Sequence, residues 1–303
     1  MAWLCAALVL VIVVLSAFIR LSQASQACEP GSLCRVGAVR MEPDAGQSPR
    51  AGVAMARLGH RVVASTALLL VVAMTGLALA SGGRLRGEAR LALTLLGLAL
   101  FLAVLGRWGG QSRLPAVTLG NLLGGFAMYA LSVRLALMAG RTDASNVQAA
   151  PAPWLGVALA LTWVQVALGG LVSAGQAGLS CPALGACDWR AGSWQALNPW
   201  VLPAADLLPT HAEGAVVHLL HRWCGLALAL VLCRLSWQEW RRGRRAVAAW
   251  LLGLPLLLVA LGVVQIGLQL PLAMVLAHNA VSALLLAVLL GMGRSEPGYA
   301  GLR

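Results

Sequence analysis

Long apolar runs constrain this chain more than any other feature of its sequence. Several exceed the roughly 20 residues that an α-helix needs to cross a bilayer. Of the 303 residues 60% are hydrophobic and only 11% are charged, which excludes a water-soluble globule. The sequence therefore predicts an all-α polytopic membrane protein with eight transmembrane helices. The expected spans are 3–21, 55–80, 91–107, 115–139, 154–174, 214–236, 247–268 and 271–292.

The first apolar run has the place of a secretory signal peptide but not its other features. It has no basic segment before it and no convincing small-residue cleavage site after it. We therefore expect it to be a retained helix.

One pattern of cysteine and histidine occurs twice. It consists of two cysteines with five residues between them, in a polar loop, followed by His-Arg at the start of an apolar run. Its members are Cys28, Cys34 and His60-Arg61 in the first copy and Cys181, Cys187 and His221-Arg222 in the second. The repeat predicts two fused, pseudo-symmetric four-helix bundles. They are expected at 1–140 and 154–303, with a cytoplasmic linker at 141–153.

Arginine residues indicate how the chain is oriented. Most loop arginines follow even-numbered spans, although Arg107 and Arg113 do not. Those that do are Arg84, Arg86, Arg90, Arg141, Arg241, Arg242, Arg244, Arg245, Arg294 and Arg303. The positive-inside rule makes these loops and both termini cytoplasmic. The cysteine loops, 22–54 and 175–213, would then face the periplasm of a bacterial-type inner membrane. The net charge of +12 therefore indicates topology and not nucleic-acid binding.

The four loop cysteines are expected to form two local disulfides, Cys28–Cys34 and Cys181–Cys187. Equal spacing and an oxidising compartment favour this interpretation. A metal site is the alternative, but it would need further cysteine or histidine nearby, and each loop offers only two thiols. The remaining cysteines lie within spans and are expected to pack as small apolar residues. They are Cys5, Cys224 and Cys233.

Three of the five histidines, His60, His221 and His278, lie near the outer ends of even-numbered spans. An ionisable side chain there is costly unless it faces the bundle interior and has a partner. His221 and His278 lie about seven residues into their spans, which places both about 10 Å below the outer surface. Two imidazoles at one depth can clamp an iron porphyrin from both sides. For a lone intramembrane histidine, a structural hydrogen bond is the alternative.

These motifs resemble those of the heme A synthase family. The resemblance covers nearly the whole chain and is carried by three features. They are the run from Gln165 through Gly169-Gly170 to Cys187, the two His-Arg pairs, and Leu276-Ala277-His278. It implies eight helices in two halves and oxidation of the C8 methyl group of heme O, by successive hydroxylations, to the formyl group of heme A.

The resemblance also implies a cofactor and a substrate site. The C-terminal half would hold heme b as cofactor, with His221 and His278 as its iron ligands. The N-terminal half would bind the substrate heme, with His60 as a ligand. Arg61 and Arg222 follow these ligands and could pair with heme propionates or snorkel to the interface. His218, one turn before His221, could support the ligand or contact a propionate.

Two residues depart from the family pattern in the N-terminal half. Arg57 stands where many members have a glutamate, and Asn121 stands where a second histidine is expected. An amide is a poor iron ligand. The site is therefore either five-coordinate, with an open face beside Asn121, or degenerate. His60, Arg61 and the adjacent glycines favour the open site, with His60 and Asn121 as its catalytic residues.

Three classes of function follow from these residues. They are a heme-modifying oxidoreductase, a diheme electron-transfer cytochrome, and a non-catalytic heme-binding assembly protein of the terminal oxidase. A plain cytochrome should keep two ligands at each heme, so His60 opposite Asn121 favours the first or the third. The expected partners are membrane lipid, heme O, heme O synthase, terminal oxidase assembly factors and an unidentified electron donor.

Overall fold

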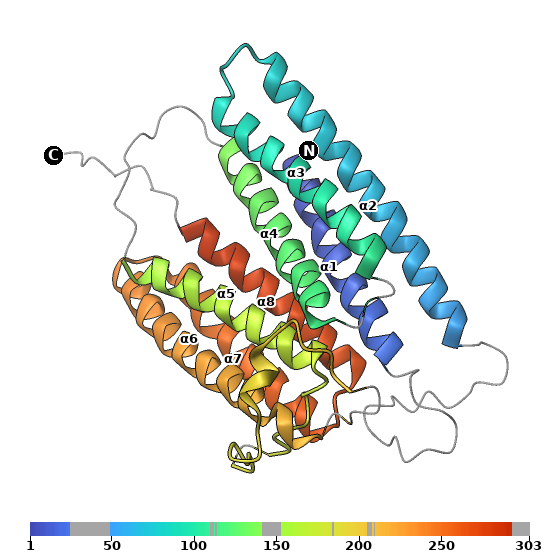
Figure 1. The fold of residues 1–303 in the computed structure, drawn as a ribbon. Helices are drawn as coiled ribbons and strands as arrows, with labels where there is room; N and C mark the ends of the chain where they lie inside the picture. Colours follow the sequence, from blue (N-terminus) through green and yellow to red (C-terminus); the bar gives the residue numbers. More distant parts are fainter. Residues whose placement is uncertain are drawn as a thin grey trace.

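Eight long helices account for most of the chain (Figure 1). The computed structural model describes residues 1–24, 49–109, 112, 114–140, 153–183, 185–204, 208 and 210–292. The long helices are α1 (Ala2–Ala24), α2 (Pro49–Ala80), α3 (Arg86–Gly109), α4 (Pro115–Ala139), α5 (Pro153–Ala174), α6 (Ala215–Arg241), α7 (Arg245–Gly267) and α8 (Leu272–Met292). Two short 3-10 helices, η2 (Trp194–Leu197) and η3 (Ala212–Gly214), lie between α5 and α6. Each long helix contains a stretch long and apolar enough to cross a membrane, and no strand occurs among these residues. The prediction of an all-α membrane protein with eight spans is confirmed.

The helices of each half contact one another in the same order. In the N-terminal half α1 packs on α2, α2 on α3, α3 on α4, and α4 on α1. In the C-terminal half α5 packs on α6, α6 on α7, α7 on α8, and α8 on α5. The halves meet through α4 and α8, flanked by the pairs α1–α8 and α4–α5. This matching order supports the predicted pseudo-symmetry and the predicted division into halves, which both remain predictions.

Apolar side chains fill both bundles and also cover their outer surfaces. The largest buried cluster, which includes Leu95 and Phe126, extends from the N-terminal half to α5 and α8. A second cluster joins α5, α6, α7 and α8 through leucines such as Leu232 and Leu251. Large apolar residues are also widely exposed on the helix surfaces, for example Leu69 at 70%. A surface that is apolar all round suits a lipid environment.

The loop between α5 and α6 marks one end of the bundle, which we call the outer end. Pro199 in this loop accepts a hydrogen bond from the backbone N–H of Ala116 in the first turn of α4, at 2.8 Å. Proline at the first helical position suits α4, because its missing N–H would be unpaired there anyway. The outer ends of α4, α5 and α6 therefore lie together beneath one loop.

A buried carboxylate joins α6 to α7 at the opposite, inner end. The Glu239 side chain is 1% exposed and accepts a hydrogen bond from Arg242 Nη1 at 2.9 Å. Its other oxygen forms an ion pair with Arg244. Gly243, with a φ of 80°, supplies the left-handed residue of the turn. The Ser236 hydroxyl donates to Ala248 O at 2.8 Å across the same junction. The turn is therefore fixed by side chains of α6 and of the turn itself, together with a backbone carbonyl of α7.

We expect Glu239→Gln to lower the free energy of unfolding by on the order of 2 kcal/mol. The neutral amide leaves two guanidinium groups without their buried counter-charge, although both remain partly exposed to solvent. Thermal unfolding of the detergent-solubilised protein should show a lower Tm. Glu213→Gln is the matched control, because that carboxylate is exposed at the outer end. Equal Tm values for the two variants would contradict the structural role of Glu239.

Candidate functional site

Two histidines of the C-terminal half lie at the same depth on α6 and α8, which lie across the four-helix bundle from each other. α6 begins at Ala215 and α8 at Leu272, so His221 and His278 are each the seventh residue of their helix. The Nδ1 atom of each is buried and has no hydrogen-bond partner among the described residues. The structure thus brings together the pair that the sequence predicted as heme ligands.

Helix α5 packs directly on the His221 ring. The side-chain amide of Gln165 lies 3.3 Å from His221 Nε2, so with the amide nitrogen as donor this ring nitrogen is the acceptor. A Cβ added at Gly169 would lie 3.0 Å from His221 Cε1. On α7, a Cβ at Gly262 would lie 3.9 Å from His278 Cε1. A glycine therefore faces each ring. The lone pair of His221 Nε2 points at the Gln165 amide.

Gln165 is a residue that we did not assign to the site from the sequence. It lies in the motif that carries the family resemblance, but its contact with His221 depends on how α5 and α6 are rotated about their axes. The sequence does contain one indication of its role: an amide within an apolar span is costly unless it has a partner.

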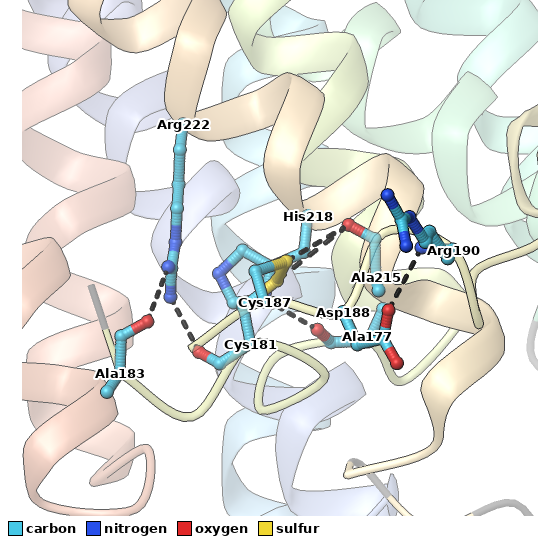
Figure 2. Close-up of a disulfide and its surroundings, with 9 residues drawn as sticks. All are labelled: Ala177, Cys181, Ala183, Cys187, Asp188, Arg190, Ala215, His218 and Arg222. Atoms are coloured by element: carbon cyan, nitrogen blue, oxygen red, sulfur yellow. Dashed lines mark hydrogen bonds between the residues drawn. A yellow bond between two sulfur atoms is a disulfide. The ribbon is translucent and has the colours of Figure 1, made fainter. Parts of the chain in front are cut away.

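The second cysteine pair forms a disulfide, as predicted. Figure 2 shows the loop closed by Cys181 and Cys187 lying against α6. Arg222 reaches from α6 to this loop and donates to Cys181 O at 2.6 Å and to Ala183 O at 2.8 Å. The structure therefore places the Arg222 guanidinium on loop carbonyls, and its pairing with a propionate remains a prediction. The other expected disulfide, Cys28–Cys34, lies outside the described residues.

His218 also contacts the backbone that leads into this loop. Its side chain is 4% exposed, and Nδ1 donates to Ala177 O at 3.0 Å. In Figure 2 it lies beside the disulfide. His218 thus links α6 to the backbone before the outer loop through a hydrogen bond. Its predicted contact with a propionate remains a prediction.

The described residues of the N-terminal half contain one imidazole contact, between α2 and α1. His60 on α2 lies with Nε2 2.9 Å from the Ser16 hydroxyl of α1. Arg57 and Arg61, on the same helix, are both exposed. Ser16 is a second site residue that we did not assign from the sequence.

Asn121 lies at the same depth as this contact. A Cβ at Gly125 of α4 would meet Val13 of α1 at 3.4 Å, and the two helices run antiparallel. One turn toward the outer end leads from Gly125 to Asn121 and from Val13 to Ser16. Asn121 is also the seventh residue of α4, as His278 is of α8. Among the described residues no hydrogen bond joins Asn121 to His60.

Fold and site together define a multi-pass helical membrane protein with a buried histidine pair in one half and a single histidine in the other. The chain belongs to the cytochrome oxidase assembly protein family, whose model matches residues 1–290.

Three relatives bear the name heme A synthase. The protein of Shewanella oneidensis is 30% identical over 193 residues, which are 58% of this chain and 56% of that protein. The protein of Maricaulis maris is 30% identical over 142 residues, 42% of this chain and 37% of that protein. The protein of Rhizorhabdus wittichii is 31% identical over 139 residues, 44% of this chain and 38% of that protein. The matches thus span about half or less of each relative, and they confirm the resemblance to heme A synthases.

Proposed function

We propose that this chain is a heme A synthase, which oxidises the C8 methyl group of heme O to the formyl group of heme A. The observation that carries the proposal is the His221–His278 pair, buried at one depth in a chain whose relatives are named heme A synthases. We further propose an inner-membrane location, with cytoplasmic termini and periplasmic cysteine loops. This orientation follows from the arginine distribution.

The residues of the C-terminal half suit a heme b cofactor. His221 and His278 would be its two axial ligands. His221 Nε2 already presents its lone pair to a polar atom, and the missing side chain of Gly169 lets α5 pack close to this ring and hold it in place. When bound, heme b would supply one-electron redox chemistry.

The surroundings of the pair would keep water out and hold the rings in place. Leucines of α6, α7 and α8 form the apolar core below it. The disulfide loop lies over the outer end of α6, where Arg222 and His218 attach it. Because Arg222 follows His221 directly, these bonds also restrict movement of the ligand-bearing turn. The candidate ligand is thus supported from α5 and from the loop.

The N-terminal half would bind heme O as substrate. His60 would ligate its iron from α2, and the Ser16 hydroxyl holds the His60 ring toward α1. Asn121 would lie across from His60 at the same depth. Because an amide is a poor iron ligand, that face would stay open to a reactant. Asn121 can still donate or accept a hydrogen bond there.

The same two departures also favour a second candidate, a heme-binding assembly protein without turnover. Arg57 is exposed and stands where many family members have a carboxylate, so a proton-transfer group is missing at this position. Contacts with heme O synthase, with terminal oxidase assembly factors and with an electron donor are proposed for either function.

Pigment analysis separates the two candidates. Membranes that supply heme O should contain heme A only when this chain is expressed, and His60→Ala should reduce heme A at least tenfold. Extracted hemes are separated by chromatography. His211→Ala is the control, because that ring caps η3, with Nδ1 accepting from Gly214 N at 3.2 Å. Heme bound without any heme A formed would establish the non-catalytic alternative.

Gly169→Ala tests the close packing on His221. The added methyl group would lie 3.0 Å from the ring, and overpacking of this kind costs about 1–3 kcal/mol. We expect the low-spin, six-coordinate heme signal to need roughly tenfold more heme for saturation. Gly262→Ala is the matched control, since 3.9 Å from His278 is an ordinary contact.

The assignment behind this test has its own check. His221→Ala and His278→Ala should each abolish or convert the low-spin component, whereas His60→Ala should leave it largely intact. An unchanged spectrum in both C-terminal variants would refute the ligand pair.

Asn121→His tests the open face of the N-terminal site. In the wild type the reduced N-terminal heme should bind carbon monoxide, whereas the C-terminal heme, ligated on both faces, should not. The variant offers an imidazole at the depth of His278, so it should gain a second low-spin heme and lose carbon monoxide binding. Asn121→Gln, which adds no iron ligand, should still bind carbon monoxide. If Asn121→His changes neither spectrum, α4 does not present this residue to a heme.

A further inference from the structure

Arg20 is a half-buried cation that the proposed chemistry has not used. It lies on α1, one turn beyond Ser16 toward the outer end. Its Nε atom is buried and has no hydrogen-bond partner among the described residues. A guanidinium group inside a membrane span is costly unless an anion or a polar group pairs with it.

The position of Arg20 on α1 directs it toward the His60 site. Residues four apart share one face of a helix, so Arg20 lies on the face from which Ser16 contacts His60. Helical side chains also lean toward the N-terminus of their helix, which brings the Arg20 side chain back toward Ser16. The cation therefore lies at the outer side of His60, within about one helical turn.

No carboxylate among the described residues of this half lies near Arg20. Among the described residues of α1 to α4 the only acidic side chain is Glu88, in the first turn of α3. α3 begins at the inner end, just after the turn formed by Gly82 and Gly83, so Glu88 lies at the far side of the bundle. The anion that Arg20 would pair with must come from a ligand or from outside the described residues.

We infer that Arg20 binds a propionate carboxylate of the substrate heme. The inference rests on the proposed function, in which His60 ligates that heme. Propionates are charged, so a heme held by His60 would turn them toward the aqueous outer end, where Arg20 lies. A guanidinium group donates two parallel hydrogen bonds to a carboxylate, which fixes orientation as well as position.

This contact would also help to select the reacting group. In heme, the methyl group at C8 shares its pyrrole ring with a propionate. An arginine that holds this propionate fixes the edge of the macrocycle on which the methyl group lies. Arg20 is thus a positioning residue for the oxidation, acting through the propionate and not on the reacting atoms.

Esterified heme provides the test. The full-length protein in detergent is titrated with hemin and with hemin dimethyl ester, whose propionates carry no charge. After reduction, carbon monoxide difference spectra report the N-terminal heme. The wild type should prefer hemin by about tenfold or more, as expected for a hydrogen bond between charged groups. In Arg20→Gln hemin binding should weaken to the level of the ester, while ester binding stays unchanged.

Two further variants make the result decisive. Arg57→Gln is the matched control, because this arginine is exposed on α2 one turn from His60, and the preference for hemin should persist. Arg20→Lys keeps the charge without the fork and should keep part of the preference. If Arg20→Gln loses the low-spin heme that reports a folded C-terminal half, the hemin preference of Arg20→Lys tests the role of Arg20 instead.

The two levels of the proposal fail differently. A full preference for hemin in Arg20→Gln, with heme still bound at His60, would overturn the role of Arg20 alone. An absence of carbon monoxide binding in the wild type, unchanged by His60→Ala, would overturn the substrate site and the role of Arg20 with it.

Discussion

The structure depends on how a membrane protein partners the polar side chains that it buries. Hydrocarbon offers no hydrogen bonds, so each buried imidazole needs a partner within the bundle. His221 has the amide of Gln165, His60 has the hydroxyl of Ser16, and His218 has a backbone carbonyl. In each case the contact uses one ring nitrogen. A histidine arranged in this way is held in orientation.

The two halves apply this arrangement with different residues on the same helical framework. α5 presents an amide and a glycine to the imidazole of α6, which permits close approach of a flat ring. α1 presents a hydroxyl to the imidazole of α2, and Arg20 lies one turn further outward on α1. α8 carries a histidine where α4 carries Asn121. Under the proposed function, the first half would offer an anion partner and an open face, whereas the second would offer two ligands.

The fold was largely predictable because hydropathy alone decides which segments can cross a bilayer. All eight spans were expected, five of them within about three residues at each end; α2 begins at Pro49 and not near 55, α3 begins at Arg86 and not near 91, and α6 ends at Arg241 and not near 236. The depth of His221 and His278 was predictable for the same reason, since rise per residue is fixed. The partners were not. The contacts of Gln165 and Ser16 depend on helix rotation, and the bonds of Arg222 to the loop depend on a backbone path that the local sequence does not determine.

Under the proposed function, the attachment of the outer loop would distinguish the ligand of a permanent cofactor from the ligand of an exchangeable substrate. Arg222 follows His221 and is bonded to two carbonyls of the disulfide loop, so the ligand-bearing turn of α6 cannot shift without breaking charged hydrogen bonds. Arg61 follows His60 in the same way, but its side chain is exposed. A cofactor that stays bound benefits from the first arrangement, because a fixed ring keeps its iron ligand in place. A substrate that must enter and leave requires the second, because its ligand must be able to release it.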